Sequence, residues 1–245
     1  MPRNLALRVY ALLLAGALAG CAGKEVVSRG DPLEGVNRAI FSVNDTLDKY
    51  ALTPVAETYR DYLPAPIRTG IRNFFANLDD LWVGANSLLQ GKVGDALNDW
   101  MRVVINTSFG IGGLFDTASD AGLEKHNEDF GQTLASWGLA SGPYLVLPLF
   151  GPSTLRDGAA YLTIDARAGP LPLFADAVTN AHEVALRNTL AATSNISFRA
   201  SALDSVNLLE RAALDRYAFA REAFMQRRRY LIHDGAPPRE PDPED

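Results

Sequence analysis

The sequence contains a single cysteine, Cys21, so no disulfide can form within the chain and the fold must rest on packing. Its three histidines, His126, His182 and His233, are scattered without the HxH or HExxH spacing of a metal site. We find no G-x-S-x-G nucleophile elbow, no phosphate-binding loop and no calcium loop. The sequence therefore offers no positive sign of catalysis or of a bound metal, and we expect a protein that is not an enzyme.

Positive charge is also scarce, with 23 Lys and Arg residues against 29 Asp and Glu residues and a formal net charge of −6. This balance argues against nucleic acid as a partner and against electrostatic docking to anionic lipid. The apolar run Val9–Ala19 is too short for a membrane-spanning helix, which needs about 20 apolar residues.

Residues 1–20 have the pattern of a secretory signal peptide. Arg3 and Arg8 form its charged start, Val9–Ala19 is its apolar core, and Leu18-Ala19-Gly20-Cys21 matches a lipobox. From this lipobox we expect cleavage before Cys21 and acylation of that residue. Attachment to the membrane would then come from the acyl chains, since stable anchoring needs two or more hydrophobic signals. Cleavage leaves 225 residues with a formal charge of −8, enough chain for a substantial core.

Helical signals begin after a short tether, residues 21–30. Asp31-Pro32-Leu33-Glu34 has the order of an N-cap, a first-turn proline and a capping-box glutamate. Apolar residues then recur at helical spacing, the first set being Val36, Ile40, Val43, Leu47 and Tyr50. The pattern predicts helices over residues 31–50, 53–63, 67–78, 77–90, 93–107, 129–137, 154–167, 176–193, 201–214 and 215–231.

Three details of this pattern carry structural predictions. Asn77 is expected to start a new helix, with Asp79-Asp80 favoured by the dipole of its first turn. The helix over 93–107 is apolar nearly all round at its end and is therefore expected to be buried. Asp116, Asp120 and Glu124 are spaced like a solvated face. We predict one all-α domain over residues 31–235 and a disordered acidic, proline-rich tail over 236–245.

One apolar segment, Pro143–Phe150, does not fit a helix because it contains Pro148. As a strand it would place Tyr144 and Val146 on one face and Leu145 and Leu147 on the other. Leaving such side chains wet would forgo about 1.5–3 kcal/mol each. We therefore expect both faces to be covered by protein, by lipid or by one of each. A buried proline-rich connector is the plainer interpretation.

The chain resembles the MlaA/VacJ family of outer-membrane lipoproteins over nearly the whole of residues 31–235. The matching pieces are Asp31-Pro-Leu-Glu-Gly-Val-Asn-Arg38, Tyr59-Arg-Asp-Tyr62, Ile71-Arg-Asn-Phe74 with Asn77-Leu78, Leu89-Gln-Gly91, Ile105-Asn-Thr107 with Gly110-Ile-Gly-Gly113, Phe130-Gly131, Gly142-Pro-Tyr144, Leu155-Arg-Asp157 and Arg221-Glu-Ala-Phe224. The chain departs from the family pattern at Gly158-Ala159-Ala160 and matches it poorly over residues 170–200.

The resemblance implies a single ring-like bundle of short amphipathic helices around a central channel, lying in the inner leaflet of the outer membrane and facing the periplasm. Such proteins take mislocalised phospholipid from the outer leaflet, associate with a trimeric porin and pass the lipid to a periplasmic carrier of the Mla type. Ala22 after Cys21, by similarity to enterobacterial lipoproteins, implies sorting to the outer membrane. No cofactor is implied beyond the lipid on Cys21 and the transported phospholipid.

A lipid that passes through a protein needs an apolar wall for its tails and a polar path for its head group. The candidate wall or gate is the hairpin segment Pro143, Tyr144, Leu145, Val146, Leu147, Pro148, Leu149 and Phe150. Arg156 and Asp157 follow it, and an arginine there suits a phosphate, although a local Arg–Asp pair at a helix start fits equally. Candidates near the channel mouth, whose plainer interpretation is a polar helix face, are Asn37, Arg38 and Asn44.

Two other function classes stay open. A structural adaptor that scaffolds a porin complex without transporting lipid would share the lipobox and the amphipathic helices. A lipid-degrading enzyme would need a nucleophile or metal constellation that the sequence does not display.

Overall fold

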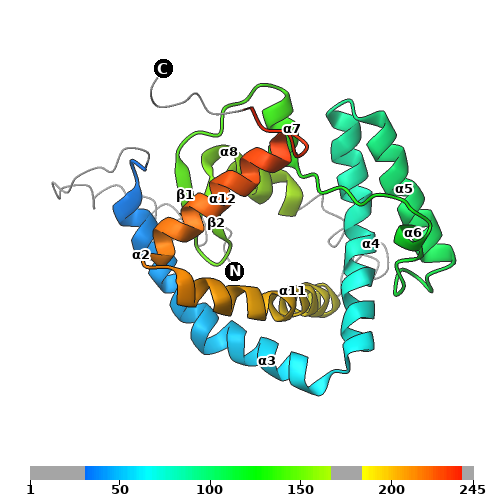
Figure 1. Ribbon diagram of the computed structural model, residues 1–245, viewed down its shortest axis with the longest axis horizontal. Coiled ribbons are helices and arrows are strands. Elements are labelled where there is room, and N and C mark those ends of the chain that lie inside the picture. Colours follow the sequence, from blue (N-terminus) through cyan, green and yellow to red (C-terminus); the bar gives the residue numbers. More distant parts are fainter. Residues whose placement is uncertain (1–30, 167–183, 239–245) are drawn as a thin grey trace.

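The computed structural model describes residues 31–166 and 184–238. The signal peptide and Cys21, the tether up to residue 30, the apolar piece Gly169–Phe174, the start of the helix predicted over 176–193 and the tail from residue 239 lie outside the described residues. Helices dominate the described part, and two short strands form one hairpin, as Figure 1 shows.

The α-helices are α2 (Glu34–Leu47), α3 (Thr53–Tyr62), α4 (Ala65–Leu89), α5 (Val93–Ser108), α6 (Thr117–Asp120), α7 (Phe130–Ser136), α8 (Leu155–Ala160), α11 (Val184–Ala212) and α12 (Arg216–Ile232). Two π-helical turns, Asp48–Leu52 and Tyr161–Asp165, continue α2 and α8. The strands are β1 (Tyr144–Leu147) and β2 (Gly151–Thr154).

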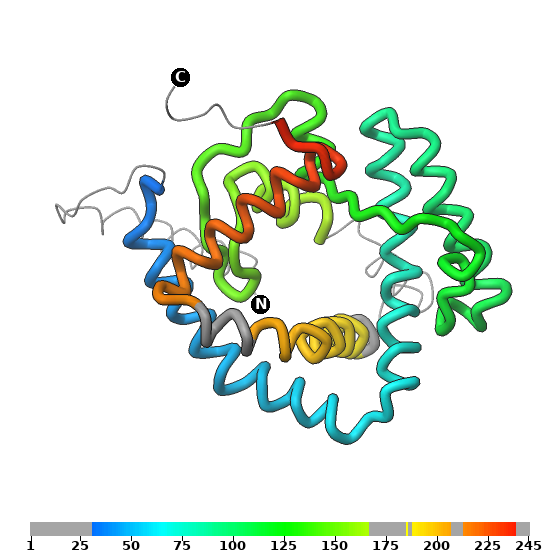
Figure 2. Tube along the Cα trace, viewed as in Figure 1, coloured from blue at the N-terminus to red at the C-terminus, as the bar shows by residue number. Residues whose placement is uncertain are grey.

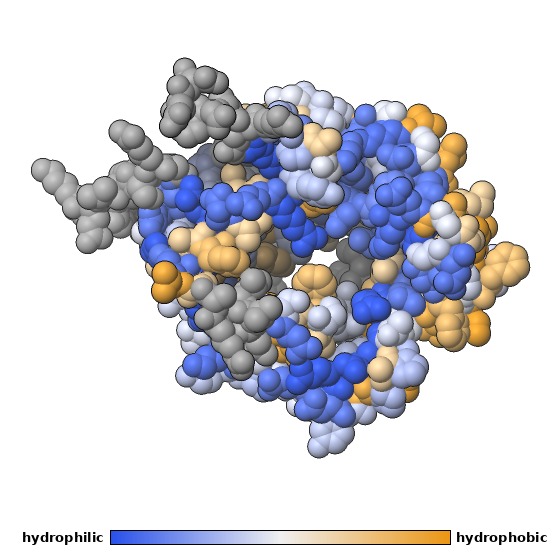
Figure 3. All heavy atoms as spheres, in the orientation of Figure 1, coloured by the Kyte–Doolittle hydropathy of each residue, from blue (hydrophilic) through white to orange (hydrophobic). Residues whose placement is uncertain are grey.

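The elements are arranged in a ring-like outline around an open middle (Figures 1 and 2). The α2–α3 arm and α4 form two sides, while α7, α8, the hairpin and α12 form the third. Helix α11 packs against α3 and α4, and α5 packs against the outer side of α4. In space-filling view this face is hollowed at its centre (Figure 3). The mainly helical fold expected from the sequence is confirmed.

Two predicted helix boundaries are wrong. Asn77 does not start a helix, because α4 runs unbroken from Ala65 to Leu89 and the Asn77 amide donates to Thr107 Oγ1 on α5 at 3.1 Å. The break expected between residues 193 and 201 is also absent, since α11 is continuous from Val184 to Ala212. Weak helix formers are tolerated at such points because tertiary contacts override local propensity.

The predicted capping box at Asp31 is also wrong in detail. Leu33 is the residue that precedes α2, and Glu34 forms an ion pair with Arg38. The Asp31 carboxylate is buried and accepts hydrogen bonds from Leu33 N and from the hydroxyl of Tyr217 on α12. Asp31 therefore joins the first and last described helices, which closes the ring.

Many of the fully buried side chains are polar and many large apolar side chains are exposed, which inverts the pattern of burial in an ordinary soluble protein. The two apolar cores are small. One consists of Ala56, Ala200 and Leu203 with Tyr59 against it. The other is built from Tyr144, Val146 and Tyr217, with the flanking side chains Ile40, Phe41, Phe224 and Met225. Large apolar side chains lie instead on the surface, where exposure of this extent marks an interaction site.

Helix α5 shows the inversion most clearly and corrects a prediction. It was expected to be buried, but Leu97, Met101 and Val104 are 50–60% exposed. Its buried residues are Ala96, Asp99, Arg102 and Asn106, which face α4 and α6. Figure 3 shows apolar side chains gathered on the outer edge over α5. The apolar stripe predicted on the first helix is also exposed in part, at Val43, Leu47 and Tyr50.

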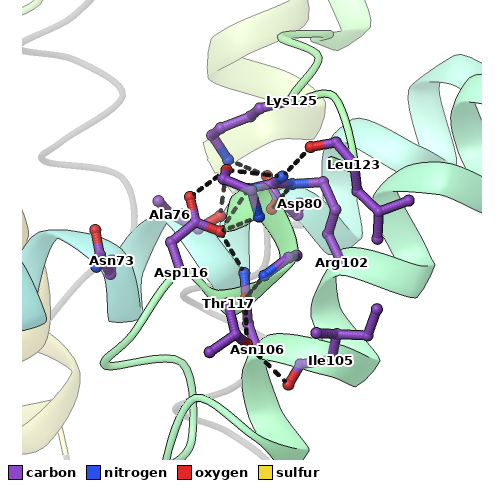
Figure 4. A network of polar contacts seen from close by, with 12 residues as sticks. Asn73, Ala76, Asp80, Arg102, Ile105, Asn106, Asp116, Thr117, Leu123 and Lys125 are labelled. Atoms are coloured by element: carbon purple, nitrogen blue, oxygen red, sulfur yellow. Dashed lines mark hydrogen bonds and ion pairs between the residues drawn. The ribbon is translucent and has the colours of Figure 1, made fainter. Parts of the chain in front are cut away.

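A buried polar network joins α4, α5 and α6 (Figure 4). Arg102 is 1% exposed and contacts Asp80 through Nε at 3.3 Å and Asp116 through Nη2 at 2.9 Å. Lys125 also pairs with Asp80, and the Arg102 Nη1 group donates to the Leu123 carbonyl at 2.7 Å. Asp80 is therefore a buried ion-pair partner in mid-helix, and Asp116 belongs to the same network rather than to a solvated face.

Among the described residues, no helix combines the length and the apolar character that crossing a bilayer would require. The long helices α4 and α11 carry charged and polar side chains along their length.

Candidate functional site

The predicted apolar hairpin forms a two-stranded antiparallel sheet. Tyr144 pairs with Thr154 and Leu147 with Gly151, which leaves Pro148, Leu149 and Phe150 in the turn. Tyr144 and Val146 are buried in the second core, as their shared face predicts. Protein does not cover the tip, where Leu149 is 73% and Phe150 56% exposed, and coverage of the tip by lipid stays a prediction.

Two asparagines of α2 take the place of a third strand beside β1. Asn37 donates to the Tyr144 carbonyl at 3.0 Å and accepts from Val146 N at 2.9 Å. Asn44 donates to the Leu147 carbonyl at 2.9 Å and accepts from Leu149 N at 2.8 Å. Seven residues of helix and three of strand both span about 10 Å, so one helix face matches the free edge of β1.

Replacing Asn37 by leucine should lower the free energy of unfolding by about 2–4 kcal/mol, because two buried backbone groups would each lose a partner worth about 1–3 kcal/mol. The same change at Asn44 should cost about 0.5–1.5 kcal/mol, since water can reach the half-buried Asn44 site. Urea unfolding of both variants measures the difference. An equal or larger loss of unfolding free energy at Asn44 would contradict this account of how the two asparagines hold β1.

A cavity of about 410 Å³ lies between α2, the hairpin tip, α11 and α12. One wall comes from α2 and the π-helical turn that continues it, and consists of Phe41, Asn44, Asp45, Asp48 and Leu52, which follow one another at helical spacing on one face. Its remaining walls are mostly apolar and comprise Leu149, Phe150, Gly151, Pro152, Val206, Ala213, Phe219, Ala220 and Ala223, with Arg199 and Arg216.

Two ion pairs form the polar edge of this cavity. Arg199 on α11 contacts Asp48 through Nε at 2.7 Å and Nη2 at 2.6 Å. Arg216 on α12 contacts Asp45 through Nη1 at 2.9 Å and Nη2 at 2.5 Å. Hydrogen bonds from Arg199 hold the pKa of Asp48 below its ordinary value despite partial burial. The cavity thus combines apolar walls with paired opposite charges along one edge.

Arg38, a predicted head-group candidate, lies outside this cavity in the seam between α2 and α12. Its guanidinium binds Asp215 through Nη1 at 3.1 Å and Nη2 at 2.7 Å and lies 4.4 Å from the centre of the Tyr217 ring. Hydrogen bonds from Arg38 lower the pKa of Asp215 to about 2. In this structure Arg38 therefore fastens the start of α12 to α2.

Arg156 and Asp157 form the local pair that one of the two sequence interpretations predicts. Arg156 Nε donates to Asp157 Oδ1 at 2.8 Å, and Thr154 caps α8 by accepting from Asp157 N at 3.2 Å. Asp157 also pairs with Arg228 of α12, which binds Asp129 as well. Burial opposes ionisation of Asp129, but hydrogen bonds from Arg228 outweigh it and lower the pKa.

These contacts make Arg156 and Asp157 a link between α7, α8 and α12. A Cβ added at Gly131 would lie 2.5 Å from Arg228 and 2.6 Å from Asp157, so only glycine lets α7 approach this link. A phosphate-binding role for Arg156 stays a prediction.

Asp79 precedes Asp80 on α4 and is exposed, but protein atoms crowd its carboxyl. Partial loss of hydration through this crowding raises the pKa of Asp79; Lys125 opposes the shift, and neighbouring Asp80 adds to it. A carboxyl whose pKa is raised on folding stabilises the fold below its unfolded pKa and loses that effect as pH rises through the folded pKa. Ionised Asp79 is therefore a destabilising group at neutral pH.

Changing Asp79 to asparagine should consequently raise the melting temperature at pH 7–8. The gain should vanish below about pH 4, where Asp79 is protonated in both states. Thermal unfolding across this pH range measures the effect, and Asp120→Asn, an exposed aspartate of α6, is the matched control. A gain that is equal at pH 4 and pH 8 would contradict this assignment.

Within residues 31–166 and 184–238, no group of three or more His, Cys, Asp or Glu side chains is placed to hold a metal ion. His126 lies in the loop between α6 and α7, is half-buried, and contacts Asp99 at 3.0 Å.

The sequence did not single out Asp45, Asp48, Arg199 and Arg216, which carry the polar edge of the cavity. Each pair joins residues more than 140 positions apart, so no local motif announces it. Their only sequence signal is the spacing of Asn44, Asp45 and Asp48 on one face of the first helix.

Comparison with known proteins gives a consistent result. A family model described as MlaA lipoprotein matches residues 29–231. Two proteins named intermembrane phospholipid transport system lipoprotein MlaA are similar to this chain. The one from Escherichia coli (strain K12) is 37% identical over 94% of this chain and 90% of its own length. The one from Haemophilus influenzae is 35% identical over 92% of this chain and 90% of its own length.

A solved structure reported under the words "Structural basis for maintenance of bacterial outer membrane lipid asymmetry" has the same fold. It superposes with a TM-score of 0.66 at 36% sequence identity, covering 83% of this chain and 99% of the solved one. Together with the matched family model, these similarities show that the chain belongs to the MlaA lipoprotein family.

Proposed function

We propose that this protein is an outer-membrane lipoprotein that removes mislocalised phospholipid from the outer leaflet and passes it through the ring to a periplasmic carrier, which maintains lipid asymmetry. The similar Escherichia coli protein, matched over nine-tenths of its length, is named as an intermembrane phospholipid transport lipoprotein. In this proposal the protein is a conduit and performs no chemical step on the lipid.

The observation that carries the proposal is the inverted burial. Polar side chains such as Asn37, Asp80 and Arg102 are almost fully buried, whereas Val43, Leu97 and Val104 are more than half exposed. A surface of this kind suits a body that lies among acyl chains without crossing the bilayer. Acyl groups on Cys21 would hold it there, in the inner leaflet and facing the periplasm.

The cavity supplies what a passing lipid needs. Its apolar walls suit acyl chains, and the Asp48–Arg199 and Asp45–Arg216 pairs offer a polar edge with both signs of charge. A volume of about 410 Å³ falls within the about 300–1,000 Å³ of ligand sites, enough for part of one phospholipid. The exposed tip residues Leu149 and Phe150 lie at the wall of this cavity and complete the proposed gate.

A trimeric porin and a periplasmic phospholipid carrier of the Mla type are the proposed partners. The alternative is an adaptor that scaffolds a porin complex without moving lipid, and the exposed apolar face of α5 would suit that role as well. The two functions differ in whether the cavity has to admit lipid.

A clean deletion of the gene tests the proposed function. The deletion should raise the phospholipid content of the outer leaflet and the sensitivity of the cells to detergent, and a wild-type copy should reverse both. Unchanged outer-leaflet phospholipid in the deletion would overturn the proposal. Hydrolysis of phospholipid by the purified protein would instead revive the enzyme class.

A further inference from the structure

A second, smaller cavity of about 170 Å³ lies where α3, α4 and α11 meet, at the corner where α3 turns into α4 (Figure 1). Tyr59 enters it from α3, Arg68 and Arg72 from α4, and Ser197 and Ser201 from α11. The small side chain of Ala200 leaves the space open above the core of Ala56 and Leu203. The corner is thus lined mainly by hydrogen-bonding side chains.

The two arginines of this cavity differ from seven other described arginines, each of which pairs with a carboxylate. Arg68 and Arg72 are one helical turn apart, a spacing at which like charges repel. In the part of the chain that the structure describes, no carboxylate pairs with either of them. Arginines that do pair with a carboxylate are Arg38, Arg60, Arg102, Arg156, Arg199, Arg216 and Arg228.

Two polar atoms at this corner are buried without a partner. The Tyr59 hydroxyl and Arg68 Nε have no hydrogen bond to any described residue, and such atoms are rare in folded proteins. The Ser201 hydroxyl already donates to the Phe198 carbonyl at 2.7 Å. The buried donors without an acceptor are therefore those of Tyr59 and Arg68, and the exposed guanidinium of Arg72 lies beside them at the rim of the cavity. A cluster of donors and positive charge without an acceptor calls for an anionic ligand.

We propose that this corner binds a phosphate group through Arg68, Arg72 and Tyr59. The planar fork of an arginine matches two oxygens of a phosphate, and two arginines together can donate to several of the oxygens that share its negative charge. The cavity is smaller than the about 300 Å³ at which ligand sites begin, so it admits a phosphate-sized group and no acyl chain. The protein as a whole has a net charge of −6 and does not attract anions in general. A phosphate would therefore bind here through local contacts.

The phosphate can come from a phospholipid head group or from a free phosphate ion. A head-group source rests on the proposed function, whereas the anion site itself does not. Titration calorimetry of the detergent-purified, full-length protein with glycerophosphoglycerol and, separately, with inorganic phosphate distinguishes the two. Tighter binding of the diester supports a head-group site, and tighter binding of the inorganic ion supports a site for free phosphate.

In either case Arg68→Gln with Arg72→Gln should weaken binding at least tenfold, and Tyr59→Phe should weaken it a few-fold. Arg227→Gln removes an exposed charge from α12 and should leave binding within twofold of the wild type. Melting temperatures check that the variants are folded. If the double variant is unfolded, the binding measured for Tyr59→Phe decides the question. No binding of either probe by the wild type, or wild-type binding by the altered proteins, would overturn the site. Neither result bears on whether the protein carries phospholipid.

Discussion

Replacing Arg102 by leucine should lower the free energy of unfolding by about 3–5 kcal/mol, as expected when one partner of a buried ion pair is removed. Arg102 is 1% exposed and neutralises Asp80, which is equally buried. Lys125 still contacts Asp80 in the variant, but Asp116 loses one of its donors and the Leu123 carbonyl loses the guanidinium. Urea unfolding followed by circular dichroism measures the loss.

The matched control is Arg60→Leu, which removes an arginine whose partner Asp204 is 94% exposed. A surface pair of this kind contributes about 0–1 kcal/mol, so the control should stay close to the wild type. Adding Asp80→Leu to Arg102→Leu should recover part of the lost stability, because the uncompensated buried charge is then gone. Equal effects of Arg102→Leu and Arg60→Leu would contradict the structural role of the network.

Replacing Leu149 by aspartate should abolish lipid transport while leaving the fold intact. Leu149 has a backbone φ of +69°, a left-handed conformation that aspartate and asparagine tolerate better than leucine. Its side chain is 73% exposed at the hairpin tip, so little packing is lost. A charge on the apolar wall of the cavity would have to be desolvated by acyl chains, at a cost of several kcal/mol.

Cells that carry only Leu149→Asp should show as much outer-leaflet phospholipid as the deletion strain. Leu149→Asn is the matched control, because it has the same size and backbone tolerance without the charge, and it should retain at least partial function. Melting temperatures of both variants should lie close to that of the wild type. Full activity of Leu149→Asp would mean that acyl chains do not pass the hairpin tip.

Local sequence signals predicted where several elements begin. The starts predicted for the helices over 129–137, 154–167 and 215–231 are confirmed, since Asp129, Thr154 and Asp215 each accept from a backbone N–H of the helix that follows. Pro148 likewise excluded a helix correctly, although the second strand, β2, lies just beyond the predicted segment Pro143–Phe150. Such signals succeed because their physics involves only neighbouring residues.

The orientation of the apolar faces could not be predicted in the same way. Helical spacing identifies an apolar stripe on α5, but it does not say whether protein or lipid covers the stripe. Met101 and Val104 look like core residues for this reason, although the buried face of the helix carries Asp99 and Arg102. Asn77 failed as a helix start because its amide is used across the α4–α5 interface.

The candidate site depends on contacts between distant parts of the chain. Asn37 and Asn44 were singled out, but their role beside β1 becomes visible only when α2 and the hairpin are brought together. The sequence shows Arg68 and Arg72 as two charges on one helix, but it does not show that no carboxylate among the described residues pairs with either of them. Polar sites assembled from separate helices leave little trace in local spacing.

The most direct test of the central claim is native mass spectrometry of the full-length protein purified from outer membranes in mild detergent. The wild type should carry bound phospholipid, and Leu149→Asp should carry at least tenfold less while Leu149→Asn keeps most of it. Wild-type protein that emerges free of lipid from membranes rich in phospholipid would contradict the claim that this ring of helices admits phospholipid.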